Sequence, residues 1–104
     1  MKEFARLVDI VATLRSAEGC PWDREQTIDS LKPYMLEETY EVLEAIDHHD
    51  HASLCEELGD FIFEAVFVAQ LEAEAGHFTV ADARDTADLV EAVVSDAMRR
   101  HPAP

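Results

Sequence analysis

Residues 30–47 read SLKPYMLEETYEVLEAID, and residues 53–76 read SLCEELGDFIFEAVFVAQLEAEAG. In both stretches apolar residues recur at spacings of three and four, which is the period of an amphipathic α-helix. Only a short polar segment separates the two. The sequence therefore predicts a pair of long helices joined by a tight connection.

The same period marks one further helix on each side of this pair. Four helices are expected. The first covers residues 2–16, and the second runs from Thr27 or Asp29 to residue 47. The third covers residues 53–76, where Ser53 and Glu56 form a capping-box pattern, and the fourth runs from Thr79 or Asp82 to residue 100. No segment shows the sustained alternation of a half-buried strand. Short connections favour antiparallel neighbours, so we expect one all-α domain over residues 1–104, an antiparallel four-helix bundle.

Composition limits what such a domain can bind. The chain has 23 Asp and Glu against 8 Lys and Arg, a formal net charge of -15. This charge repels nucleic-acid backbones and anionic lipid, so we expect neither a nucleic-acid polymer nor a membrane as partner. No stretch approaches the roughly 18 apolar residues of a membrane span. Cys20 and Cys55 show no paired spacing, and a soluble cytoplasmic protein is expected.

Acidic residues interrupt the apolar faces of the two central helices. On the first helix Glu38 lies within the apolar stripe and Glu41 flanks it; the stripe itself contains Leu31, Met35, Val42, Ala45 and Ile46. On the second helix Glu57 lies at the edge of the stripe and Asp60 follows three residues later; that stripe contains Leu54, Leu58, Phe61, Ala65 and Val68. Surface ion pairs do not account for these acids, because no Lys or Arg lies between residues 32 and 84.

Four carboxylates that converge between two helices cannot all stay ionised unless a cation shares the site. Oxygen ligands of this kind favour Mg²⁺, or Mn²⁺, over Zn²⁺. A di-iron site is disfavoured because it needs Glu-x-x-His motifs, and no His follows Glu38, Glu41 or Glu57 at that spacing. The loop DHHDH at residues 47–51 is a second candidate for a metal site, although such a segment more often forms a polar turn without a metal.

Several blocks occur along nearly the whole chain in a defined order: EGCPWD at 18–23, QT at 26–27, LEETYE at 36–41, EELGD at 56–60, GHF at 76–78 and RRHP at 99–102. In this order they resemble the MazG-type nucleoside triphosphate pyrophosphohydrolase domain, of the all-α NTP pyrophosphatase superfamily. The metal signature of that family, EExxE followed by ExxD, is matched by residues 37–41 and 57–60.

The resemblance implies a Mg²⁺-dependent enzyme that hydrolyses an NTP or dNTP to the monophosphate and pyrophosphate, in house-cleaning or control of the nucleotide pool. The residues that it implies for the metal are Glu38, Glu41, Glu57 and Asp60, with Glu37 as a further candidate for positioning water. Trp22 is a candidate for stacking on the base, or else an ordinary packing residue. Lys32, Arg99 and Arg100 are candidates for phosphate contacts, although the two arginines also suit the end of a helix.

The chain departs from the family pattern at three places. Ile28 stands where His is frequent, Asp96 stands where many members have Lys, and the usual aromatic tail is replaced by Ala103-Pro104. These departures keep open an alternative, a non-hydrolytic nucleotide-binding or dimerisation domain of the same fold.

A homodimer or a dimer of dimers is expected from the 53–76 helix, which is apolar on more than one side. Phe63 and Phe67 point away from the predicted core stripe, so a lone bundle would expose them. We therefore expect both rings in a subunit interface, as the family resemblance also implies.

Overall fold

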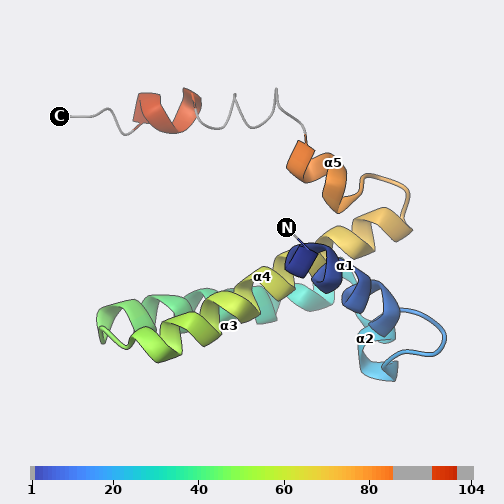
Figure 1. Cartoon of the computed structure of the whole chain (residues 1–104), viewed down its shortest axis with the longest axis horizontal. Coiled ribbons are helices and arrows are strands. Elements are labelled where there is room, and N and C mark those ends of the chain that lie inside the picture. Colours follow the sequence, from blue (N-terminus) through green and yellow to red (C-terminus); the bar gives the residue numbers. More distant parts are fainter. Residues whose placement is uncertain (1, 86–94, 101–104) are drawn as a thin grey trace.

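The computed structural model describes residues 2–85 and 95–100, and within them helix is the only regular secondary structure (Figure 1). The helices are α1 (Lys2–Leu14), α2 (Pro21–Glu25), α3 (Ile28–Asp47), α4 (His51–Glu74) and α5 (Val80–Asp85). Residues 95–100 are also helical. The predicted all-α class is thereby confirmed.

The helices α3 and α4 form an antiparallel hairpin and lie side by side in Figure 1. Of the two predicted caps, Thr27 and Asp29, Thr27 caps α3: its hydroxyl accepts from the Ser30 backbone N–H at 3.1 Å, and Ser30 Oγ accepts from the Thr27 N–H at 2.7 Å. The helix α4 begins near Ser53, as predicted, but Ser53 is not its cap. The cap is Asp50, whose carboxylate accepts from the Ser53 N–H at 3.1 Å, so the helix begins at His51.

The core lies where α1 packs against the C-terminal half of α4. Its buried members are Val11, Leu31, Val66, Phe67 and Leu71, and the side chains packed against them are Phe4, Leu7, Val8, Phe63 and Val68.

The connection that follows α1 passes very close to the end of that helix, because a Cβ on Gly19 would lie only 2.3 Å from the carbonyl oxygens of Thr13 and Leu14. Glycine is therefore required where the chain turns back over the end of α1.

The inward face of α4 differs from the predicted one. Leu58 and Phe61, expected in the core, are 44% and 43% exposed, whereas Phe67 is 1% exposed and Phe63 packs against the core. The prediction that Phe63 and Phe67 lie in a subunit interface is therefore wrong. The physical reason is that α1 gives the second half of α4 another packing partner besides α3.

Two further differences concern short segments. The five-residue helix α2 was not predicted, because a helix that short has no apolar period to detect. The last predicted helix begins after Thr79, whose hydroxyl accepts from the Asp82 N–H at 3.2 Å, but its residues 86–94 lie outside the described part of the chain. The four-helix bundle therefore stays a prediction. No helix in the described ranges is long and apolar enough to cross a membrane.

Candidate metal centre

Three glutamates converge between α3 and α4. One carboxylate oxygen from each of Glu38, Glu41 and Glu57 lies within 4.8 Å of the other two. Glu38 and Glu41 share a face of α3 because they are three residues apart, and the antiparallel pairing places Glu57 of α4 opposite them. All three side chains are half-buried. Three like charges are thus concentrated in a space that one ion can occupy.

Two oxygens of this group have no partner. Glu38 Oε1 and Glu57 Oε2 are both buried, and neither accepts a hydrogen bond. A buried carboxylate oxygen without a donor is costly, because it has lost water and gained nothing in exchange. A divalent cation with a preference for oxygen ligands would supply the missing interaction, so the donor set fits Mg²⁺ or Mn²⁺.

The pKa values reflect the same crowding. Burial is the main cause that raises the pKa of Glu38, and the charges of Glu41, Asp60 and Glu64 add to it. The neighbouring Glu38 carboxyl is the main cause that raises the pKa of Glu57, and the Glu57 carboxyl does the same for Glu41. The three groups therefore hold protons more tightly than an ordinary glutamate, and a cation would compete with those protons.

The other two predicted acids lie at the margin of the group. Asp60 is exposed and does not join the three converging carboxylates, although its charge contributes to the raised pKa of Glu38 and of Glu57. Glu37 is also exposed. Sequence reasoning overlooked Glu64, which is half-buried and has a raised pKa, caused first by burial and then by the charge of Asp60. Its position seven residues after Glu57, two helical turns along α4, was the available signal.

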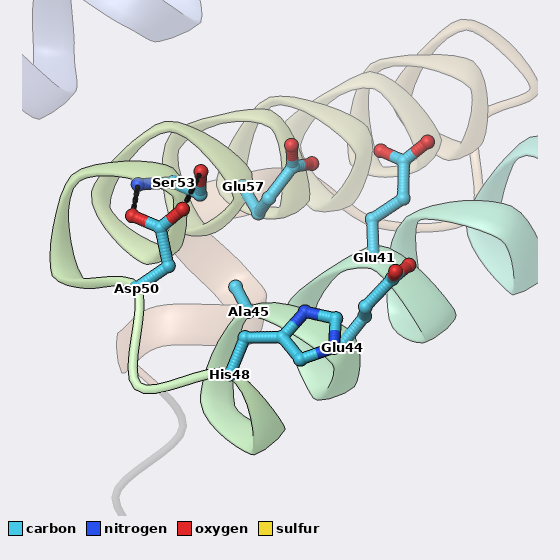
Figure 2. Close-up of a pocket in the computed structure, with 7 residues that line it drawn as sticks. All are labelled: Glu41, Glu44, Ala45, His48, Asp50, Ser53 and Glu57. Atoms are coloured by element: carbon cyan, nitrogen blue, oxygen red, sulfur yellow. Dashed lines mark hydrogen bonds between the residues drawn. The ribbon is translucent and has the colours of Figure 1, made fainter.

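A pocket of about 300 Å³ opens beside the glutamates, toward the turn that joins the two helices (Figure 2). The residues that line it are Glu41, Glu44, Ala45, His48, Asp50, Ser53 and Glu57. Of the three histidines in the 47–51 loop, only His48 lines this pocket. The loop histidines do not come together as a metal-binding group in the part of the chain that the structure describes.

The predicted substrate contacts come from three places: Trp22 from α2, Lys32 from the first turns of α3, and Arg99 and Arg100 from the helical residues 95–100. Trp22 on α2 is 48% exposed and meets the ring of Tyr34 on α3 edge-on, with ring centroids 5.6 Å apart. Lys32 lies 3.8 Å from Asp29. Asp96 forms ion pairs with Arg99 at 3.3 Å and with Arg100 at 3.0 Å. None of the predicted contact residues belongs to the group of converging carboxylates.

Comparison with known proteins identifies the family of the chain. The model of the MazG nucleotide pyrophosphohydrolase domain matches residues 26–103, and the chain belongs to that family. It is 47% identical over 103 residues to a nucleoside triphosphate pyrophosphohydrolase of Escherichia coli K12. It is 46% identical over 99 residues to the nucleoside triphosphate pyrophosphohydrolase/pyrophosphatase MazG of Thermotoga maritima.

A third relative is the uncharacterized protein YabN of Bacillus subtilis, 42% identical over 100 residues. The three alignments cover 98%, 95% and 96% of this chain but only 37%, 36% and 19% of the respective relatives. The chain thus spans little more than a third of the length of the E. coli and T. maritima proteins, and less of YabN.

Proposed function

We propose that this chain hydrolyses nucleoside triphosphates, NTP or dNTP, to the monophosphate and pyrophosphate. The observation that carries the proposal is the pair of buried, unpartnered oxygens that Glu38 and Glu57 contribute from opposite helices. The names of the E. coli and T. maritima relatives support the same activity. Glu38, Glu41 and Glu57 would hold Mg²⁺ or Mn²⁺, with Asp60 at the edge of the site.

The chain's own residues set the conditions for the reaction. A bound divalent cation supplies Lewis-acid polarisation of phosphate oxygens and a lower pKa for an attacking water. The carboxylates of Glu38, Glu41 and Glu57 repel a free triphosphate, so the site accepts this substrate only together with cations. To Glu37, which is exposed beside Glu38, we assign the orientation of the water that attacks the α-phosphorus, from which pyrophosphate leaves.

The remaining candidates would hold the ends of the substrate. We assign base stacking to the exposed ring of Trp22, and phosphate contacts to Lys32, Arg99 and Arg100. The ion pairs of both arginines with Asp96 mean that a phosphate must compete with that carboxylate. The role that we propose for the reaction is house-cleaning or control of the cytoplasmic nucleotide pool.

The test is release of pyrophosphate from a panel of NTPs and dNTPs with Mg²⁺. Glu38→Gln and Glu57→Gln are expected to lower activity about 100-fold or more, because each removes a metal ligand. Glu56→Gln is the matched control, since Glu56 is exposed and adjacent to Glu57. Calorimetry that detects nucleotide binding without any turnover would contradict the proposal and favour a non-hydrolytic binding or dimerisation domain.

We also propose that a second copy of the chain covers exposed apolar residues of α3 and α4, giving a homodimer or a dimer of dimers. These large side chains are Leu36, Tyr40 and Leu43 on α3 and Leu58 and Ile62 on α4. Exposed apolar residues gathered on neighbouring helices are typical of association surfaces. Light scattering at micromolar concentration tests this, and a monomer would contradict it.

A further inference from the structure

Arg15 joins two parts of the chain that are distant in sequence. It directly follows α1, and its Nε and Nη2 donate to the two carboxylate oxygens of Glu74, in the last turn of α4, at 3.0 and 2.6 Å. Its Nη1 donates to the carbonyl oxygens of Asp23, Arg24 and Gln26 at 2.8, 2.8 and 3.0 Å. The Arg15 side chain is 11% exposed. One guanidinium therefore ties the end of α2 to the end of α4.

The contacts of Arg15 bear on the stability of the helix α2. This helix has only five residues, and helices that short are not stable without tertiary contacts. Its N-cap, Cys20, makes no side-chain hydrogen bond to it. The last carbonyls of any helix lack partners within the helix and carry partial negative charge, so a cation there both satisfies and stabilises them. Arg15 supplies that cation to α2.

The helix α2 carries Trp22. The Trp22 carbonyl accepts from Gln26 Nε2 at 3.0 Å, and the Trp22 ring packs edge-on against Tyr34. Tyr34 precedes Glu38 by four residues on α3, which is one turn, or about 6 Å along the axis. The place of α2 therefore sets the place of an exposed aromatic ring that packs on Tyr34, one turn of α3 before Glu38.

We propose that Arg15 and Glu74 are positioning residues for the nucleobase: they fix α2, and through it the ring of Trp22, relative to the metal-binding glutamates. This inference rests on the proposed function, because it takes Trp22 as the base contact. Neither Arg15 nor Glu74 is placed against the substrate, so both act through α2. Their loss should weaken nucleotide binding and leave the chemistry at the glutamates in place.

Trp22 is the only tryptophan of the chain, so its fluorescence reports on α2 alone. The experiment compares the wild type with Arg15→Lys, which keeps the charge but not the planar fork, and with Glu74→Gln. Arg6→Gln is the control, because Arg6 is exposed on α1 and its side chain forms no ion pair or hydrogen bond with the residues that the structure describes. Acrylamide quenching and anisotropy are measured without metal or nucleotide, and kcat and KM are measured with Mg²⁺.

We expect Trp22 to become more accessible to acrylamide and to lose anisotropy in both variants but not in the control. The value of kcat/KM should fall roughly 10- to 100-fold through KM, with kcat nearly unchanged. Stabilisation by Mg²⁺ should match that of the wild type. Wild-type Trp22 fluorescence in both variants, or a fall in kcat at constant KM, would overturn the proposal.

The test also covers a variant that does not fold and a wild type that shows no activity. If Arg15→Lys does not fold, Glu74→Gln alone decides, because it leaves the bonds from Arg15 to the α2 carbonyls possible. If the wild type releases no pyrophosphate, the proposed function fails, and the Kd for ATP, read from Trp22 fluorescence, replaces KM. An equal Kd in wild type and variants would then overturn the positioning role.

Discussion

Glu38 on α3 and Glu57 on α4 each bury one carboxylate oxygen that accepts no hydrogen bond, and the two carboxyls lie within 4.8 Å of each other through their candidate ligand atoms. The pKa of both is raised, that of Glu38 mainly by burial and that of Glu57 mainly by the neighbouring Glu38 carboxyl. The hairpin is therefore held together against a local repulsion that a proton or a cation relieves.

Metal binding should stabilise the folded chain. With Mg²⁺ at about 100 times its Kd, the free energy of unfolding is expected to rise by about 2.7 kcal/mol. For a domain of this size that corresponds to a rise of about 10–20 °C in Tm. Thermal unfolding with and without Mg²⁺ measures it. Glu38→Gln and Glu57→Gln should lose the effect, and equal stabilisation in these variants and in Glu56→Gln would contradict the metal site.

The metal-free protein should show a defined pH dependence. Because the pKa of Glu38 is raised above its ordinary value of 4.5, the folded state binds this proton more tightly than the unfolded state. The free energy of unfolding contributed by Glu38 is therefore greatest below pH 4.5 and falls as the pH rises through the raised pKa.

Urea unfolding in the presence of a chelator, at a series of pH values, measures this dependence. The difference in free energy of unfolding between wild type and Glu38→Gln isolates the contribution of Glu38. This matters because Asp50 and Glu74 have lowered pKa values and lose their contributions as the pH falls. A wild-type advantage that grows as the pH rises would contradict the assignment.

Two phenylalanines can test which face of α4 points into the core. Phe67→Ala should cost about 3–5 kcal/mol, because the ring is fully buried and its removal leaves a cavity. Phe61→Ala should cost about 1 kcal/mol, since this ring is 43% exposed. Urea unfolding of both variants provides the measurement. A larger loss of unfolding free energy in Phe61→Ala than in Phe67→Ala would mean that the face predicted from the helical period is the inward one.

Two glycines should respond to alanine in opposite directions. Gly59 lies inside α4 with nothing within 4 Å of an added Cβ, so Gly59→Ala should raise the free energy of unfolding by about 0.5–1 kcal/mol. Gly76 has a φ of 82°, so Gly76→Ala should lower it by about 1 kcal/mol. Thermal unfolding measures both. A loss of stability in Gly59→Ala that depends on protein concentration would instead place a second copy against Gly59.

The helix boundaries that could be predicted are those set by local bonds. Thr27 and Thr79 were each one of two predicted helix starts, beside Asp29 and Asp82, because a hydroxyl can bond to backbone three residues away, a distance visible in the sequence. The inward face of α4 could not be predicted in the same way. That helix is apolar on two sides because it packs against both α3 and α1, and its period does not say which neighbour covers which side.

The candidate site was likewise predictable only in part. Glu38 and Glu41 were found from their spacing on one helix, and Glu57 from its place on the next. Which other acids join them depends on the face that α4 turns inward, and the helical period does not give that face. Asp60 is exposed outside the group, whereas Glu64 is half-buried and its charge acts on Glu38. The anchoring of α2 by Arg15 was not predicted, since the bonds from Arg15 to Glu74 span 59 residues and follow no periodic pattern.

The turn at residues 48–50 separates α3 from α4 by only three residues, and the converging glutamates all come from residues 38–57. Contacts between residues so close in sequence form early in folding, because little chain entropy is lost when they close. We therefore expect the carboxylates to meet already in the transition state for folding. Repulsion among them would then slow the folding reaction, and a cation present at that moment would accelerate it.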